Sequence, residues 1–560
     1  MKDYQSITTE TETVQEFQFF TALIATAPTD NTRDTEHHDH ASHDIILESQ
    51  DHLAPPFDST ERKSNVFVAS FNLIATIVGG VVLSLPIVFH KCGIAFTTIA
   101  MILSAYMTYM SLLMLCLSSR KGGGSSYGEV IRSAFGEQME EVVSWLLFVF
   151  LVFVIIGYMV LIRDIWTPIV LQVFALDMDG DTILLVITVL LLPFIFQRSL
   201  HALRWNCYVG SMSIFVLCIA LNRGGWQRMM HSSSPSILHD DNSATSGFTI
   251  EFWKIPSIEA ILFSFPITTC AFLCQFNIIA VQNSLLQPTR ERTKQVIRYA
   301  IGASFLLMYM FGFGGYLYAG NNPQGNILLN IPISKQVGED EGEHFLFLIG
   351  RIGSGITIML AMPMIALPCR EALLEVVDIW YHRSHHTTNL VDNARAKTGT
   401  GKFHWKLFHW CSITPSTVQY SYTPIVTEDE ITEILSDSIE EHDVPRSSIL
   451  IRHEPIQKDY IFRNALAHYG SSVVIITTCY LGAVAVNGVD AVWSFIGSTM
   501  AFMIAFVLPC GSFIAIENSF RSVADGGEPR SISKQIAWAI LISSVLGSFV
   551  CTINSFFGTS

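Results

Sequence analysis

The sequence predicts an all-α polytopic membrane protein with eleven transmembrane helices. Half of its 560 residues are hydrophobic and only 14% are charged, whereas about a quarter of the residues in an ordinary soluble domain carry a charge. The apolar residues also gather in runs of roughly 17–25, the length that a helix needs to cross the hydrocarbon core. These two observations exclude a soluble globular protein.

Eleven apolar runs, each bounded by polar residues, glycine or proline, are the expected helices. They lie near residues 66–89, 95–117, 142–162, 183–197, 207–221, 257–281, 298–319, 345–368, 464–486, 491–516 and 535–556. The fourth and fifth runs are the shortest, so the sequence defines their ends least well.

The distribution of basic residues predicts the orientation of these helices. With the amino terminus in the cytoplasm, 26 of the 33 Lys and Arg residues fall on the cytoplasmic side, as the positive-inside bias requires. We therefore expect an integral membrane protein with a cytoplasmic amino terminus. The plasma membrane and a vacuolar or lysosomal membrane both remain open, because each places the tail in the cytoplasm.

One hydrophilic segment precedes the helices, and a second divides them into two groups. Residues 1–64 carry thirteen Asp and Glu against four Lys and Arg, and such an acidic tail is expected to be disordered. Residues 369–463 form a long cytoplasmic loop, predicted to be largely disordered, between helices one to eight (65–368) and helices nine to eleven (464–556). Both segments could bind cytoplasmic regulatory partners, although a solvated linker is the default interpretation.

The first apolar run contains a predicted break. Gly79 and Gly80 each lower helix stability by about 1 kcal/mol, and Pro86 clashes with the backbone one turn earlier, near Val82. A break at membrane depth is tolerated where it lines a cavity or contacts protein. Close helix packing through small residues is the alternative, but glycines followed by a proline favour unwinding over residues 79–82.

A second interruption is predicted in the sixth run, over residues 265–277. It contains Pro266, and its polar side chains are unlike those that face lipid. If runs 1–5 and 6–10 form two inverted halves, the two breaks are equivalent, which is typical of a transporter's binding site near the membrane midplane. Half-helix amino ends would bind a carboxylate and free carbonyls an ammonium group or a cation, so the pair suits a zwitterion such as an amino acid.

Candidate coupling residues lie in the third and eighth runs. In the third, a helix end that reaches the outer interface explains Arg163 and Asp164 most simply; otherwise Asp164 is a candidate for a proton-linked carboxylate. In the eighth, Ser354 and Thr357 are further candidates among small residues. Arg370, where this run ends, is expected to be a cytoplasmic anchor.

Five motifs in order resemble the amino acid/auxin permease family, which includes vacuolar and sodium- or proton-coupled neutral amino acid transporters. The resemblance covers about residues 64–556, apart from the long loop, and implies the five-plus-five inverted-repeat, LeuT-like fold with broken helices 1 and 6. The motifs are residues 78–86, Ser126-Tyr127-Gly128-Glu129 with Phe135-Gly136, Cys274-Gln275-Phe276-Asn277, Pro368-Cys369-Arg370, and Ile496-Gly497-Ser498 running to Leu508-Pro509.

The resemblance implies symport or antiport of amino acids by alternating access. The first-span break would contact the α-amino and α-carboxylate groups of the substrate, chiefly through its backbone. Residues of the sixth span would border the rest of the substrate. The substrate-binding residues expected on this basis are Thr76, Ile77, Val78, Gly79, Gly80, Thr268, Thr269, Phe272 and Asn277.

One departure from the family bears on the coupling ion. Sodium-coupled relatives place an Asn just before the first-span break and a Thr shortly before the eighth-span proline. Those places hold Ala75 and either Met359 or Ala361. Apolar side chains cannot replace oxygen ligands of a hard cation, so we expect co-transport of H⁺ rather than Na⁺, with a sodium-coupled symporter as the alternative.

Other function classes fit less well. A channel needs a filter loop or a ring of like charges, and neither is visible. An enzyme is not expected, because the chain shows no H-E-x-x-H zinc pair and no convincing nucleophile–base pair at membrane depth. We expect no catalytic residue, metal, cofactor or nucleic-acid partner; the expected partners are an amino acid and the bilayer. A sensor that binds an amino acid without accumulating it remains the alternative function.

Overall fold

The computed structural model describes residues 62–174, 178–197, 205–232, 252–332, 341–397, 465–486, 488–523 and 532–557. Within these ranges the chain is almost entirely helical, and the only β pairing is an isolated bridge between Ser64 and Leu285. The chain divides into two units, one comprising residues up to Val377 together with those from Ala465 onward, and the other beginning at Asp378. The predictions for residues 1–61 and 398–464 lie outside the described residues.

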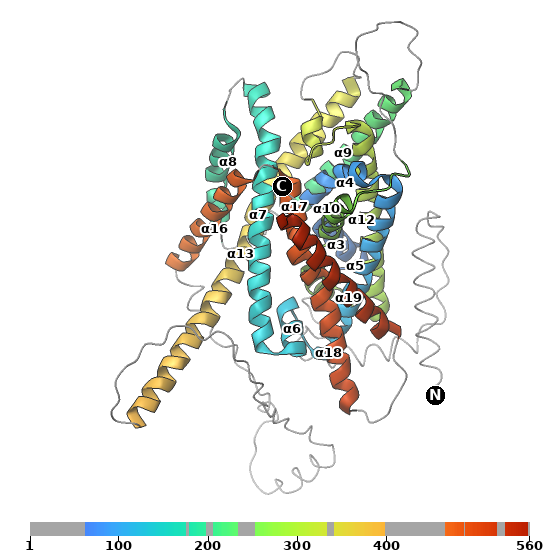
Figure 1. Cartoon of the computed structure of the whole chain (residues 1–560). Helices are drawn as coiled ribbons and strands as arrows, with labels where there is room; N and C mark the ends of the chain where they lie inside the picture. The colour runs from blue at the N-terminus through green and yellow to red at the C-terminus, as the bar shows by residue number, and fades with distance from the viewer. Residues whose placement is uncertain are drawn as a thin grey trace. The chain divides into compact units, whose positions relative to one another are not determined.

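The helices follow in the order labelled in Figure 1. They are α3 (Val66–Ile77), η1 (Gly80–Ser84), α4 (Leu85–Cys92), α5 (Ile94–Gly122), α6 (Tyr127–Phe135), α7 (Glu137–Phe174), α8 (Gly180–Ile195), α9 (Trp205–Ser232), α10 (Ile258–Ala271), α11 (Gln275–Ser284), α12 (Arg290–Ala319), η3 (Ile327–Asn330), α13 (Glu341–Lys397), α16 (Ala465–Ala485), α17 (Val489–Ile496), the π-helical η4 (Gly497–Ala501) and η5 (Met503–Val507), α18 (Leu508–Val523) and α19 (Ile532–Phe557).

Nine helices in the described part of the chain are long and apolar enough to cross a membrane, and the bent pair of α3 with η1 and α4 makes a tenth. Each of the eleven predicted runs coincides with a helix. The predicted fourth span, α8, has only 16 residues and falls short of a full crossing. The predicted fifth span is longer than expected, because α9 continues to Ser232.

The predicted loop 369–463 needs a correction at its start. Residues 369–397 are helical and continue α13 without interruption. They contain no glycine or proline, the two residues that most strongly end a helix, so nothing in the local sequence stops α13. The His, Ser, Thr and charged residues of the segment suggested a linker, but polarity by itself does not terminate a helix.

The packing in the membrane-helix unit places α7 centrally. This helix contacts α8 and α16 on one side and α17 on the other, as Figure 1 shows. The broken segments α3, η1 and α10 lie among α4, α5, α9, α12 and α17. Several of the largest buried side chains of the core come from these helices or lie directly beside the breaks, among them Leu73, Phe89, Phe272 and Trp493. The two breaks are therefore surrounded by protein rather than by lipid.

Candidate functional site

The first span breaks close to where the sequence predicts. Helix α3 ends at Ile77, and the chain resumes as a 3₁₀ turn at Gly80. The two halves of the span are bent by 49°. Pro86 lies in the first turn of α4, where its missing N–H has no helical partner to lose. The break therefore covers Val78 and Gly79. Residues 80–82, which were predicted to be unwound, form part of a tighter 3₁₀ helix instead.

The second break lies further along the sixth span than Pro266. Helix α10 runs through Pro266 to Ala271, and α11 begins at Gln275. A membrane helix tolerates an internal proline when neighbouring protein satisfies the freed backbone groups. The three residues between the helices are held by local bonds, including those from the amide of Leu273 to the carbonyl of Cys270 and from the amide of Cys274 to the side chain of Gln275.

A cavity of about 460 Å³ lies against both breaks. Its wall combines the first-span break with side chains from α7, α9, α11, α13 and α17. No Asp, Glu, Lys, Arg or His belongs to this wall as far as the chain is described. Its polar side chains are Thr76, Tyr158, Asn206, Cys207, Ser211, Cys270, Asn277, Ser354, Thr357 and Trp493.

Hydrogen bonds join the helices that form the cavity wall. The amide of Asn277 on α11 donates to the hydroxyl of Thr76 on α3 over 2.8 Å. On the opposite wall, the amide of Asn206 donates to the backbone carbonyl of Thr357 over 3.0 Å. The hydroxyl of Ser354 is buried beside it and has no hydrogen-bond partner among the described residues, so it can donate to a bound solute.

The glycines of the break are required by the close approach of α7. A Cβ on Gly80 would lie 2.7 Å from the Leu161 Cδ1 atom and 2.9 Å from Tyr158 Cε1. The backbone amide of Gly80 faces the Tyr158 hydroxyl. The Tyr158 ring packs edge-on against Trp493, with ring centroids 6.2 Å apart. Any side chain at position 80 would therefore displace the aromatic wall.

The predicted site residues fall into two groups. Those that line the cavity are Thr76, Ile77, Val78, Gly79, Gly80, Asn277, Ser354 and Thr357. Three predicted residues of the sixth span, Thr268, Thr269 and Phe272, are buried but do not line it. The Thr268 hydroxyl lies 3.4 Å from that of Ser104, so this part of α10 faces α5. The sequence showed that these residues avoid lipid, but not which neighbour they face.

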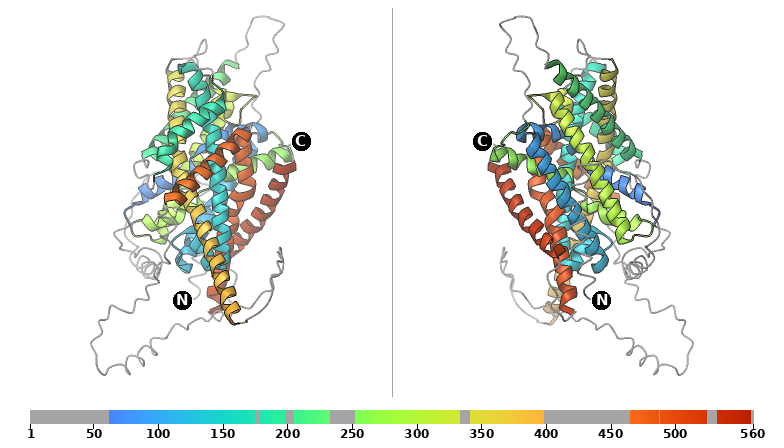
Figure 2. Two further views of the ribbon diagram at one scale, coloured as in Figure 1. Left: turned by 90° about the vertical axis from the view of Figure 1, so that its left-hand side faces the viewer. Right: turned by 90° about the vertical axis from the view of Figure 1, so that its right-hand side faces the viewer.

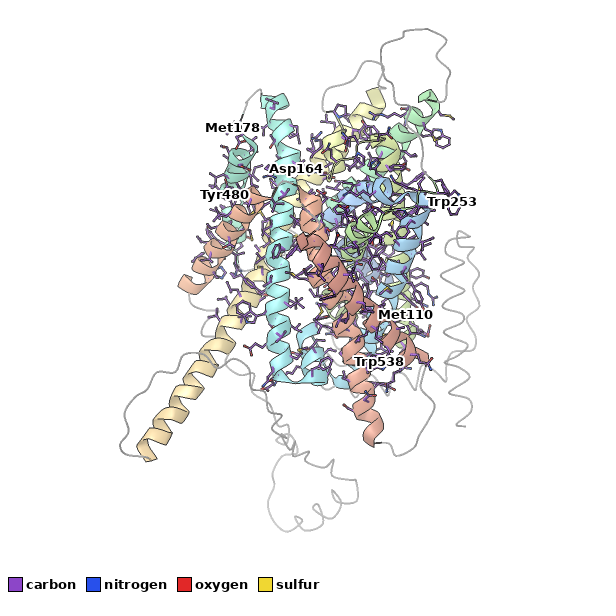
Figure 3. All side chains as sticks on the ribbon, in the orientation of Figure 1. Met110, Asp164, Met178, Trp253, Tyr480 and Trp538 are labelled. Atoms are coloured by element: carbon purple, nitrogen blue, oxygen red, sulfur yellow. The ribbon has the colours of Figure 1, made fainter. Side chains whose placement is uncertain are left out.

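The charge pair of the third span lies apart from the cavity. Arg163 does not pair with its neighbour: its guanidinium donates to Asp181 over 3.2 Å and to the carbonyls of Ala483 and Val486. Asp164, labelled in Figure 3, has Arg163 and Asn326 as favourable neighbours and Asp490 as a repelling one. Arg163 is therefore bound to the start of α8 and to the end of α16.

The cytoplasmic ends predicted for the two broken spans are tied together. The amides of Lys63 and Ser64 donate to the carbonyl of Ser284 at 3.0 and 2.9 Å. The buried guanidinium of Arg62 donates to the carbonyls of Gln282 and Asn283, each at 3.1 Å. We call residues 62–64 the Arg62 latch, because this segment joins the start of α3 to the end of α11.

Arg370, the expected cytoplasmic anchor, is buried. It is only 3% exposed, and its guanidinium donates to the carbonyls of Ile195 and Gln197 and to the hydroxyl of Ser472. The cation thus satisfies carbonyls at the carboxyl end of α8, where the helix dipole favours a positive charge.

Sequence reasoning missed Tyr158, Asn206 and Trp493, which all line the cavity. Tyr158 and Asn206 are polar groups within or beside apolar runs, a pattern that indicates a protein-facing position. Nothing in the sequence shows that they meet the first-span break, because they come from different helices.

Comparisons with known proteins bear on this site. A family model described as transmembrane amino acid transporter protein matches residues 62–557. The putative sodium-coupled neutral amino acid transporter 11 of Mus musculus is 25% identical over 321 residues, which is 56% of this chain and 65% of that protein. The vacuolar amino acid transporter 7 of Saccharomyces cerevisiae is 21% identical over 465 residues, which is 80% of this chain and 88% of that protein.

Other relatives are matched over a smaller share of their length. The chain spans 27% of a putative sodium-coupled neutral amino acid transporter 10 of Xenopus laevis, at 24% identity over 54% of this chain. Among solved structures, a Na⁺-coupled sialic acid symporter overlays with a TM-score of 0.39 and 13% identity, covering 92% of this chain and 95% of that one.

Proposed function

The chain belongs to the transmembrane amino acid transporter family, as its motifs predicted, and we propose that it is a secondary active transporter that carries amino acids by alternating access. The family is one of transporters rather than enzymes. We propose that α8 is a short fourth span, which gives eleven spans, and that spans 1–5 and 6–10 are inverted repeats. The amino terminus would lie in the cytoplasm. The protein would reside in the plasma membrane or in a vacuolar or lysosomal membrane.

The observation that supports this function most is an uncharged cavity at two broken helices. A solute with a net charge would leave that charge uncompensated at membrane depth, which is costly. A zwitterionic amino acid with an uncharged side chain has no net charge, and the backbone of residues 77–80 with the polar groups of Thr76 and Asn277 can bind its two ends. The cavity volume of about 460 Å³ is within the usual range for small-molecule sites.

We further propose that transport is coupled to protons. Ala75 and Ala361 line the cavity and offer no side-chain oxygen to a sodium ion. Ser354 and Thr357 are the two hydroxyls that α13 contributes to this wall. A hard cation needs several oxygen ligands. Asp164 would instead accept the proton and weaken its repulsion with Asp490.

A sodium-coupled symporter is the second candidate, because the Ser354 hydroxyl is a free ligand and the relative in Mus musculus is named as putatively sodium-coupled. A sensor that binds an amino acid and signals through cytoplasmic partners of residues 1–64 and 369–463 is the third. The three candidate functions predict different accumulation of amino acids when the purified protein is placed in a sealed vesicle.

Uptake into proteoliposomes tests the proposed function. The full chain would be reconstituted and offered a panel of labelled amino acids with neutral, acidic and basic side chains. We expect neutral amino acids to accumulate and charged ones not to compete with them. Binding of an amino acid without accumulation would favour the sensor, and accumulation of only basic or only acidic amino acids would contradict the role given to the uncharged wall.

A further inference from the structure

The tenth predicted span contains an unusual stretch of backbone. Between α17 and α18 the chain runs as two π-helical segments, η4 and η5, in place of a regular α-helix. The amide of Leu508 donates to the carbonyl of Met503, five residues earlier, which is the bonding of a π-helix. Such turns hold more residues than α-helical ones, are rare, and occur frequently at functional sites. We call residues 497–507 the π segment.

The π segment lies beside the second broken span and the cavity. Its first part, η4, contacts α10, and its second part, η5, contacts α11. Gly497 in η4 has no room for a side chain, because a Cβ would overlap the backbone of Pro266. Trp493, one turn before Gly497, lines the cavity, and its ring packs on Gly157 of α7 so closely that a Cβ there would lie 2.6 Å from the Trp493 Cη2 atom. The π segment therefore connects the second break with the Trp493 side of the cavity wall.

Pro509 leaves two carbonyls of the π segment short of a donor. A proline has no N–H, so it cannot bond to Ala505, four residues earlier as in an α-helix, or to Ile504, five residues earlier as in a π-helix. An unpaired carbonyl is costly at membrane depth, because no water reaches it. Two side chains supply donors instead. The Tyr127 hydroxyl donates to the carbonyl of Ile504 over 2.9 Å, and the Ser111 hydroxyl donates to that of Ala505.

The hydroxyl groups that bond to the π segment come from three neighbouring helices. Tyr127 begins α6 and Ser111 lies in α5, and both are buried. The carbonyl of Ser498 accepts further bonds from the hydroxyls of Ser548 and Thr552 in α19, at 2.8 and 3.1 Å. Figure 2 shows α19 beside the helix that runs from α17 to α18. Side chains thus take the place of backbone donors along the π segment.

The alternative to this arrangement is a regular α-helix made of the same residues. In an α-helix the carbonyl of Ile504 would accept the amide of Leu508, so only the π-helical arrangement requires the Tyr127 hydroxyl. Each residue of an α-helix turns the chain by about 100°. Taking up the extra residue of a π-helical turn would therefore rotate α17 relative to α18 by about that angle, and Trp493 would leave the cavity wall.

We propose that Tyr127 is a positioning residue for amino acid transport. Its hydroxyl holds the tenth span in π-helical bonding and so keeps Trp493 in the cavity wall, although Tyr127 itself does not line the cavity. This role presupposes the transport function proposed above. Loss of the hydroxyl shifts the π segment toward α-helical bonding and weakens the binding of the substrate.

The Tyr127→Phe variant removes the hydroxyl and leaves the ring in place. In proteoliposomes we expect its KM for a neutral amino acid to rise roughly fivefold, from the usual net contribution of one hydrogen bond, while the maximal rate stays near that of the wild type. The matched control is Tyr480→Phe. The hydroxyl of Tyr480 donates to the carbonyl of Asp181 over 3.2 Å, which lies within the regular helix α8, so this variant should transport as the wild type does.

A second substitution tests whether the hydroxyl acts through the π segment. Alanine at position 509 supplies the missing N–H, which can bond to the Ile504 carbonyl in place of the Tyr127 hydroxyl. We expect Tyr127→Phe/Pro509→Ala to recover most of the lost affinity and Pro509→Ala alone to have a KM near that of the wild type. A packing role of Tyr127 would show no such recovery, because an amide at position 509 restores no contact of α6. Recovery also shows that Tyr127→Phe does not act by misfolding.

Hydrogen–deuterium exchange of the purified full chain provides a readout that does not depend on transport. Exchange of the amides of residues 503–512 should be faster in Tyr127→Phe than in the wild type or Tyr480→Phe, and slower again in Tyr127→Phe/Pro509→Ala. Absence of uptake by the wild type would contradict the proposed function alone, and the exchange rates would still test the hydroxyl. Three results would overturn the role of Tyr127: an unchanged KM in Tyr127→Phe, no recovery with Pro509→Ala, or equal exchange in Tyr127→Phe and the wild type.

Discussion

Gly80 is a position at which the first span lies close against α7. A Gly80→Leu substitution would place its Cβ within 3 Å of both Leu161 and Tyr158, and its side chain would fill part of the cavity. Overpacking of this kind costs about 1–3 kcal/mol, which a large membrane bundle can survive. We expect amino acid uptake to fall to background, while the amount of protein in the membrane stays near that of the wild type.

Gly470 provides the matched control for this substitution. It lies in α16, and a Cβ added there has no atom within 4 Å. The Gly470→Leu variant should therefore transport as the wild type does. If Gly80→Leu also transports normally in the same vesicles, the first-span break is not the substrate site.

Asp164 is the residue that the proposed proton coupling depends on most directly. Its charged and polar neighbours are Arg163, Asn326 and Asp490. Asparagine has nearly the same shape but cannot ionise, so Asp164→Asn should remove most of the dependence of uptake on external pH. The measurement is the initial rate of uptake over a range of external pH.

A nearby carboxylate serves as the control for Asp164. Asp179 is exposed just before α8, and its side chain makes no capping bond. Asp179→Asn should leave the pH profile unchanged. If the pH profile of Asp164→Asn is also unchanged, Asp164 does not carry the coupled proton and only lies beside the Arg163–Asp181 pair.

At the scale of elements, local composition predicted where the helices and breaks lie better than it predicted which helices pack against one another. Two adjacent glycines placed the first break within about a residue of Val78 and Gly79, because the helix weakens where the residues themselves disfavour it. The second break, at residues 272–274, lies within the predicted interruption 265–277 but not at Pro266, since a proline inside a membrane helix is tolerated where neighbouring protein compensates. The residues 369–397 were misjudged because polarity was taken for the absence of a helix.

The composition of the cavity wall could be predicted only in part. Asn277 is polar in the sixth apolar run, which indicated that it faces protein, and it bonds to Thr76. Thr268 and Thr269 give the same signal but lie outside the cavity wall. Tyr158 and Trp493 join the wall through packing of α7 against α17, and one sequence does not reveal which helices pack together.

The Arg62 latch is the element that ties the two broken spans together on the side predicted to be cytoplasmic. Hydrogen bonds to a charged group contribute about 1.5–3 kcal/mol, so losing the two bonds of Arg62 should favour separation of α3 from α11. We expect Arg62→Gln to increase the reaction rate of Cys207, a cavity-lining thiol, with a maleimide several-fold, measured by mass spectrometry.

Lys63 is the control for the latch. Its side chain is exposed and only its backbone amide bonds to Ser284, so Lys63→Gln should leave the reaction rate of Cys207 unchanged. Equal rates in Arg62→Gln and the wild type would mean that the latch does not limit access to the cavity.

At the scale of the whole molecule, the helices enclose an uncharged cavity, and the carboxylates named here lie apart from it. A driving ion that binds away from the solute must act by changing which arrangement of helices is favoured, and it can shift that balance only by its differential affinity for the arrangements. Asp164 on α7 contacts the region of η3 and α17, so its protonation state bears on how these elements pack. This separation favours a proton, which needs one carboxylate, over a sodium ion, which needs a cage of oxygens.

We therefore expect an inwardly directed proton gradient to drive amino acid accumulation in proteoliposomes. Accumulation should collapse when a protonophore discharges the gradient and should persist when choline replaces sodium on both sides. The Gly80→Leu protein in the same lipid gives the background rate. The decisive quantity is the ratio of accumulation in the two ion conditions. A strict requirement for sodium would overturn the proton coupling and would make the Ser354 hydroxyl the first group to test as a sodium ligand.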